Sequence, residues 1–211
     1  MLQKSETNNA IVTRLCAVRP HPNADRLKLA TVLGAQVIVG LDAKDGDLVV
    51  YFDSNLQLSP EYLYFNNLYA KSELNKDGAQ KGYFGNNGRV KAQKFRGEIS
   101  NGLAMPLSSL IFPGAIQHYD DLDLQEGDEF THINGVKICE KYIIPEVHPT
   151  DRSKKQILRL LTDMFHLHWD TKQLMRKKER IAPGIIYIEE KIHGTSGRVA
   201  NVLCNTGKKW W

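Results

Sequence analysis

Residues 11–52 read IVTRLCAVRPHPNADRLKLATVLGAQVIVGLDAKDGDLVVYF. Short apolar runs rich in β-branched residues recur in this stretch, and Pro, Gly, Asn and Asp separate them. The runs predict strands at residues 11–18, 27–33, 36–39 and 48–52. Short strands parted by turns at near-regular spacing are typical of a small barrel or sandwich.

The pattern continues with less regularity up to residue 149. Residues 62–74 are predicted to form a helix over the mouth of the barrel, and residues 75–78 to end it. Asn134-Gly135 predicts a hairpin that completes or abuts the barrel. Residues 142–149 contain Pro145 and Pro149 and predict a linker. We therefore expect one domain at 1–144, with an inserted loop or helix, and a second at 145–211.

Two stretches of the first domain carry a family resemblance. His21-Pro22-Asn23-Ala24-Asp25-Arg26-Leu27 and residues 90–104 resemble the OB-fold domain that precedes the catalytic domain in one branch of the RNA ligases. The first stretch is also similar to OB domains that bind tRNA in aminoacyl-tRNA synthetases. Because OB barrels hold strands in a basic groove, the resemblance implies RNA contacts for Lys91, Lys94 and Arg96. The alternative is an exposed strand face that carries charge for solubility.

Charge is distributed unevenly along the chain. Residues 1–150 carry 15 Lys/Arg and 18 Asp/Glu, whereas residues 151–180 carry nine basic and four acidic residues. Ile157, Leu158, Leu160 and Leu161 fall at helical spacing, and a second, short basic helix is expected after them. Basic patches attract polyanions, so the second helix adds Lys172, Arg176 and Lys177 as candidate RNA contacts. A solvated helix face is the alternative.

A lysine follows the last apolar run of the chain. Residues 185–188 read as a buried strand, and Glu189-Glu190-Lys191-Ile192-His193-Gly194-Thr195-Ser196-Gly197-Arg198 comes directly after it. Gly194 allows the backbone to approach a ligand closely. One interpretation of Lys191 is an ordinary surface lysine at a strand end. The other is a nucleophile, because a desolvated ε-amine loses its proton readily and can attack phosphorus.

The run from Lys191 to Thr195 resembles motif I of the covalent nucleotidyltransferases. His193, where DNA ligases carry aspartate, looks like the RNA ligases, and residues 168–198 as a block resemble the opening of the RNA ligase domain. The resemblance implies that Lys191 takes AMP from ATP with Mg²⁺ or Mn²⁺, and that RNA 5′-phosphate and 3′-hydroxyl ends are then sealed. It implies nucleotide contacts for Glu190, His193, Gly194, Thr195, Ser196 and Arg198.

The expected fold class is a β-rich α+β chain. An N-terminal OB-fold barrel would precede the N-terminal portion of a nucleotidyltransferase (ATP-grasp-like ligase) domain. Residues 201–211 supply no further carboxylate or basic motif, so we expect a fragment, a chain completed by a second polypeptide, or a relative that only binds RNA. The rival function is accordingly a non-catalytic RNA- or tRNA-binding OB module.

The cellular compartment and the metal content are predicted from the lack of paired cysteines, membrane-spanning runs, a signal peptide and metal-ligand spacings in the sequence. Cys16, Cys139 and Cys204 are odd in number and far apart, which favours free thiols in a reducing compartment. No apolar run approaches the roughly 20 residues of a membrane span, and residues 1–9 are polar, unlike a signal peptide. A cytoplasmic protein is expected. No Cys, His or carboxylate spacing predicts a protein-held metal site.

Overall fold

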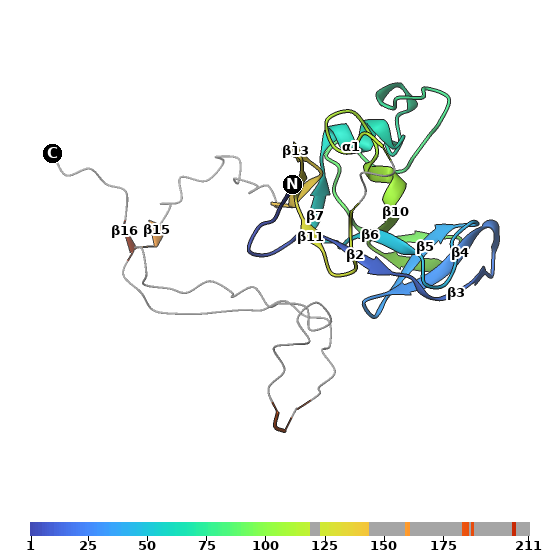
Figure 1. The fold of residues 1–211 in the computed structure, drawn as a ribbon, viewed down its shortest axis with the longest axis horizontal. Helices are drawn as coiled ribbons and strands as arrows, with labels where there is room; N and C mark the ends of the chain where they lie inside the picture. Colours follow the sequence, from blue (N-terminus) through green and yellow to red (C-terminus); the bar gives the residue numbers. More distant parts are fainter. Residues whose placement is uncertain (119–122, 144–158, 161–182, 186, 188–203, 206–211) are drawn as a thin grey trace, which may run out of the picture. The chain divides into compact units, whose positions relative to one another are not determined.

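The computed structural model describes residues 1–118, 123–143, 159–160, 183–185, 187 and 204–205. The chain divides into two compact units, Met1–Ile144 and Pro145–Trp211. Nearly all described residues belong to the first unit, which is mainly β-structure (Figure 1).

A five-stranded barrel forms the centre of the first unit. The first barrel strand consists of β2 (Ala10–Arg14) and β3 (Cys16–His21), and the last consists of β9 (Glu98–Asn101) and β10 (Leu103–Pro106). The three between them are β4 (Ala24–Val32), β5 (Ala35–Gly40) and β6 (Leu48–Phe52). Antiparallel pairing joins β3 to β4, β4 to β5, β10 to β6 and β6 to β2. The Ile38 N–H donates to Ser100 Oγ at 3.0 Å, which places β9 beside β5 and closes the circle. A five-stranded barrel in this order is the arrangement of an OB fold.

The first and last barrel strands each change sheet partway along. Residues 11–18 were expected as one strand, and this expectation is wrong: β2 ends at Arg14 and β3 begins at Cys16, with Ala17 at a φ of 52°. At the other break, Gly102 has a φ of 109°, and a Cβ there would lie 2.5 Å from the Phe52 carbonyl oxygen. Only glycine fits this bend. The remaining strand predictions in 11–52 are confirmed within a few residues.

Two apolar clusters lie on opposite faces of β2 and β6. The inner cluster fills the barrel with Ile11, Leu15, Ala30, Val32, Val37, Val39, Val49, Tyr51 and Ala104. The outer cluster includes Val12, Val50 and Phe52 and packs against the segments after β6. Figure 1 shows β2 and β6 between α1 (Pro60–Phe65) and the β3–β4–β5 sheet. A strand buried on both faces is apolar at consecutive positions, which explains the unbroken apolar run of β6.

The segment between β6 and β9 covers the outer cluster. It contains β7 (Leu56–Leu58), α1, a 3-10 turn η1 (Ser72–Leu74) and β8 (Ala92–Phe95). The predicted helix at 62–74 is wrong beyond Phe65, because Asn66 and Asn67 follow, with Asn67 at a φ of 54°. Helix α1 also packs on the outer face of β6, where Tyr62 meets Phe52 at 5.3 Å between ring centroids, and does not cover the barrel mouth.

The end of the first unit abuts the barrel. The elements are η2 (Leu107–Leu110), β11 (Glu129–Phe130), β12 (His132–Ile133), β13 (Val136–Lys137) and β14 (Cys139–Lys141). The hairpin predicted at Asn134-Gly135 is confirmed, with both residues at positive φ. Strand β12 also pairs with β1 (Leu2–Gln3), β11 with β2, and β14 with β7.

In the second unit, the described strands are β15 (Arg159–Leu160) and β16 (Cys204–Asn205), which pair antiparallel. The helix predicted around Leu160 is therefore wrong at Arg159 and Leu160, where pairing with a distant strand replaces the local helical pattern. Within the described residues, no helix has the length and apolarity to cross a membrane.

Candidate nucleic-acid interface

The β8–β9 hairpin presents the cationic residues of the first unit's candidate site. Ala92 pairs with Asn101 and Phe95 with Glu98, which leaves Arg96 and Gly97 as a two-residue turn. Their φ values of 46° and 103° are those of a tight hairpin turn matched to strand twist. Side chains alternate along β8, so Lys94 is exposed and Phe95 half-buried.

The turn between β3 and β4 holds the tip of this hairpin. The Asn23 backbone N–H donates to His21 Nδ1 at 3.1 Å, so the ring proton lies on Nε2. Nε2–H then donates to the Phe95 carbonyl at 3.1 Å. The Asn23 side-chain amide donates to the Arg96 carbonyl at 3.0 Å. His21 is buried, so the barrel itself positions the tip.

The hairpin is also joined to β5 and β6. Gln36 Nε2–H donates to the Ile99 carbonyl at 3.0 Å and to Glu98 Oε2 at 3.1 Å. The Tyr51 hydroxyl donates to the Asn101 carbonyl at 2.6 Å. In OB folds, the loops after strands one and four, with the face of strands two and three, form the ligand surface. Here those two loops meet at His21 and Phe95.

Aromatic residues near the hairpin pack inward. Phe95 meets the edge of Tyr83 at 5.2 Å between centroids, and Tyr83 stacks on Phe84 at 4.6 Å. Burial raises the pKa of Tyr83 to about 12. The large apolar side chain that the hairpin exposes is Ile99, paired across from Lys94. The hairpin therefore offers cations for phosphates rather than rings for stacking on bases.

The structure brings together three of the predicted site residues. Lys91 directly precedes β8, Lys94 lies within it, and Arg96 forms the turn; all three are exposed. The other predicted site residues lie outside the described part of the chain: Lys172, Arg176, Lys177, Glu190, Lys191, His193, Gly194, Thr195, Ser196 and Arg198.

Sequence reasoning missed the roles of His21 and Asn23. Both lie in the stretch that carries the OB resemblance, but the pattern indicated only a turn there. Their partners, Phe95 and Arg96, are more than 70 positions away. The available signal was a histidine beside a turn in an otherwise apolar barrel, because a buried polar side chain needs a fixed partner.

A pocket of about 600 Å³ lies elsewhere on the barrel. Its floor consists of inner-cluster residues, among them Leu15, Val39 and Val49. Asp42 and Asp47 also line it, and their carboxylates repel phosphates. This pocket is therefore a poorer candidate for nucleic acid than the hairpin.

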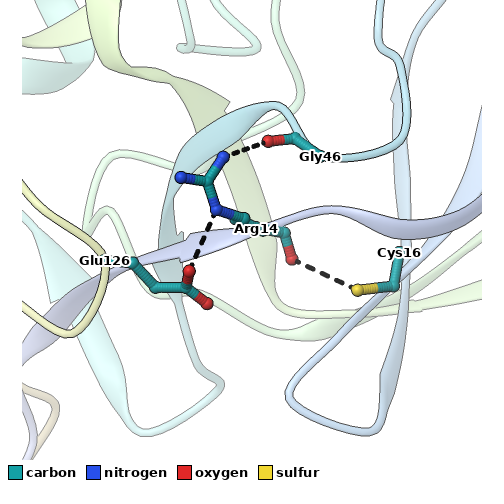
Figure 2. A network of polar contacts seen from close by, with 4 residues as sticks. All are labelled: Arg14, Cys16, Gly46 and Glu126. Atoms are coloured by element: carbon teal, nitrogen blue, oxygen red, sulfur yellow. Dashed lines mark hydrogen bonds and ion pairs between the residues drawn. The ribbon is translucent and has the colours of Figure 1, made fainter.

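Arg14, which lines this pocket, contacts two loops that are far apart in the sequence (Figure 2). Its Nε–H donates to Glu126 Oε2 at 3.0 Å, and Nη1–H donates to the Gly46 carbonyl at 2.8 Å. The guanidinium thus fastens the loop after β5 to the acidic turn before β11 and is already paired. Across the described residues, no three His, Cys, Asp or Glu side chains gather to hold a metal ion.

Comparison with known proteins bears on the barrel. A family model described as an OB-fold domain matches residues 9–107, which span the barrel and its hairpin. The expected OB-fold domain is confirmed by this match together with the strand order. No curated protein matches the chain.

Three solved structures of an RNA ligase from Naegleria gruberi are similar to the chain. The ligase with pyrophosphate is 21% identical, with a TM-score of 0.45, over 78% of this chain and 43% of that one. One mutant of it with ATP and Mn is 19% identical, with a TM-score of 0.46, over 77% of this chain and 41% of that one. A second mutant with ATP and Mn is 21% identical, with a TM-score of 0.47, over 78% of this chain and 43% of that one. This chain thus spans less than half the length of that ligase.

Proposed function

We propose that this chain is an RNA-binding OB domain joined to the adenylate-forming part of an ATP-dependent RNA ligase. The observation that carries the proposal is the β8–β9 hairpin, whose exposed Lys94 and Arg96 are held in place by His21 and Asn23. The ligase half is supported by the run from Lys191 to Thr195 and its resemblance to motif I.

In this proposal the hairpin holds RNA by its backbone. Lys91, Lys94 and Arg96 place positive charge on one hairpin, and each phosphate contact releases counterions. Contacts to phosphate fix where RNA lies without reading its sequence, because the phosphate backbone is the same at every nucleotide. Binding is therefore salt-dependent and tolerant of sequence.

The proposed chemistry begins at Lys191. Its neutral Nζ forms a bond to the α-phosphorus of ATP, the bond from that phosphorus to the bridging oxygen breaks, and pyrophosphate leaves with the electron pair. The proton lost from Nζ passes to solvent. An oxygen of an RNA 5′-phosphate then attacks the same phosphorus, and the nitrogen–phosphorus bond breaks to release the lysine amine. Finally an RNA 3′-hydroxyl loses its proton and attacks the RNA 5′-phosphorus, and AMP leaves. Glu190, His193, Gly194, Thr195, Ser196 and Arg198 are proposed to contact the nucleotide.

A divalent ion would neutralise the triphosphate during the first step, and Mg²⁺ or Mn²⁺ suits phosphate oxygens. We assign the ion to the nucleotide's oxygens and water, because Mg²⁺ keeps several waters and is commonly held through substrate phosphates. The protein's part in this step is to present Lys191.

Incubation with α-labelled ATP and Mg²⁺ tests the ligase half. We expect acid-labile label on the wild-type chain, its discharge by pyrophosphate, and its loss in Lys191→Ala. Lys208→Ala, which removes a lysine outside the motif, should retain the label. A chain that takes no label, or an equally labelled Lys191→Ala chain, would contradict adenylation at this position.

The second candidate is a non-catalytic RNA-binding module, favoured by the fact that the hairpin and its supports lie entirely within the first unit. It predicts that RNA binding is independent of ATP and is unchanged in Lys191→Ala. It also predicts that a chain which is not labelled by ATP still binds RNA. Filter binding across a salt series, with and without ATP, separates the two candidates.

A further inference from the structure

Arg89 lies against an aromatic ring at the end of the first unit. Its guanidinium carbon is 4.2 Å from the centroid of the Tyr142 ring, the geometry of a cation–π contact. Tyr142 is held in turn, because its backbone N–H donates to the Asn55 carbonyl at 2.8 Å. The aromatic ring therefore supports one side of the guanidinium.

The backbone around Arg89 is fixed as well. Arg89 forms a β-bridge with Gln57, and the N–H groups of Leu58 and Val90 donate to the carbonyls of Gly88 and Leu56, each at 2.9 Å. Gly88 has a φ of 62°, and a Cβ there would lie 2.5 Å from the Leu58 carbonyl oxygen. The half-buried Arg89 side chain thus leaves the surface at a defined place.

This guanidinium has no anionic partner among the described residues. Its Nε–H is buried and meets no acceptor there. The nearby carboxylate of Glu140, across Gln57 in the β7–β14 pair, accepts from Lys137 Nζ at 2.9 Å. A partly buried, unpaired charge is costly and is ordinarily matched by an anion.

The place of Arg89 next to the cations of the β8–β9 hairpin indicates what kind of anion it binds. Val90 is buried, whereas Arg89 and Lys91 on either side of it are half-buried and exposed. Lys91 leads directly into β8, which carries Lys94 and ends at Arg96. Arg89 therefore begins a run of four cations within eight consecutive residues.

We propose that Arg89, supported by Tyr142, is a phosphate-binding site that extends the RNA path from the β8–β9 hairpin along residues 89–91. A guanidinium matches phosphate geometry through paired N–H donors and stacks on rings, which an ammonium does not do. The free donors are those on Nη1 and Nη2, since Nε–H is buried. This site rests on the proposed RNA binding. It adds to it a position at which lysine could not replace arginine.

Fluorescence anisotropy of the whole chain with a fluorescein-labelled RNA, across a salt series, tests the site. Arg89→Gln should lower the slope of log K against log salt by about 0.7–0.9, the value of one phosphate contact. Arg89→Lys should keep most of the slope but bind more weakly. Tyr142→Leu should weaken binding with the slope retained. Lys44→Gln, an equal charge change at an exposed loop residue, should behave as wild type apart from a small general charge effect.

Unchanged affinity and slope in Arg89→Gln, with wild-type RNA binding intact, would overturn this site and leave the proposed function standing. A lower melting temperature in Arg89→Gln with unchanged RNA binding would also overturn it, because the guanidinium would then serve a carboxylate of this chain. Failure of the wild-type chain to bind RNA even at low salt would refute both proposals.

Discussion

Two regions of the barrel fasten a distant segment by different chemistry. In the hairpin region, buried His21 and its neighbour Asn23 hold the tip of β8–β9 through hydrogen bonds to backbone carbonyls. In the pocket region, Arg14 and Glu126 hold two loops through an ion pair whose side chains are 51% and 53% exposed. Removing the partner of a buried polar side chain such as His21 is costly, whereas exposed ion pairs contribute little. The comparison indicates that the hairpin is held in a fixed position and that the pocket loops are fastened more weakly.

The largest expected effect comes from breaking the hairpin support. His21→Ala leaves the Phe95 carbonyl and the Asn23 N–H without their partner, which costs about 1–3 kcal/mol of unfolding free energy. RNA affinity should fall as well, because Lys94 and Arg96 lose their fixed positions. Urea unfolding and anisotropy measure the two effects.

His118→Ala is the control, because His118 is exposed. It should leave both stability and RNA affinity unchanged. A His21→Ala chain as stable as the His118→Ala chain would show that the hairpin needs no support from the β3–β4 turn.

Breaking the pocket region should have a smaller effect. Arg14→Gln should cost less than about 1 kcal/mol, and the loss should shrink at high salt as the ion pair is screened. A double-mutant cycle with Glu126→Gln isolates the pair. A coupling as large as the loss in His21→Ala would contradict the contrast between the two regions.

The last expected effect appears only at high pH. The folded pKa of Tyr83, about 12, is above the ordinary value of about 10, so the folded state retains a proton that the unfolded state releases. Its contribution to stability is full below pH ~10 and is lost as the pH rises towards about 12. The stability of wild type should therefore fall relative to Tyr83→Phe in this range. If urea unfolding gave wild type and Tyr83→Phe the same dependence of stability on pH, the prediction would be refuted.

The strands were predictable where the sequence pattern was local. Leu48–Phe52 was predicted with the observed bounds, because an apolar run with turns on both sides fits a strand buried on both faces. Asn134-Gly135 was equally clear, since few other residues accept two positive φ values. The helix prediction failed after Phe65 because the side chain of Asn75 instead bonds the backbone of Tyr69, which folds the segment into a loop.

The candidate site was predictable only in part. Lys91, Lys94 and Arg96 were predicted from their charge within the OB resemblance, and they lie exposed on or directly before the β8–β9 hairpin. What holds the hairpin is a contact between residues 21 and 95, and no local pattern contains such a pair. The roles of Lys191 and its neighbours stay predictions, because they lie outside the described residues.

The most direct test of the account compares the salt dependence of RNA binding in two variants with equal charge loss. One carries Lys94→Gln and Arg96→Gln in the hairpin region, and the other carries Lys44→Gln and Arg14→Gln in the pocket region. The account predicts that the hairpin variant loses about 1.4–1.8 from the slope of log K against log salt, for two phosphate contacts, while the pocket variant stays close to wild type. Equal losses in the two variants would contradict it, because RNA would then respond to net charge rather than to the hairpin.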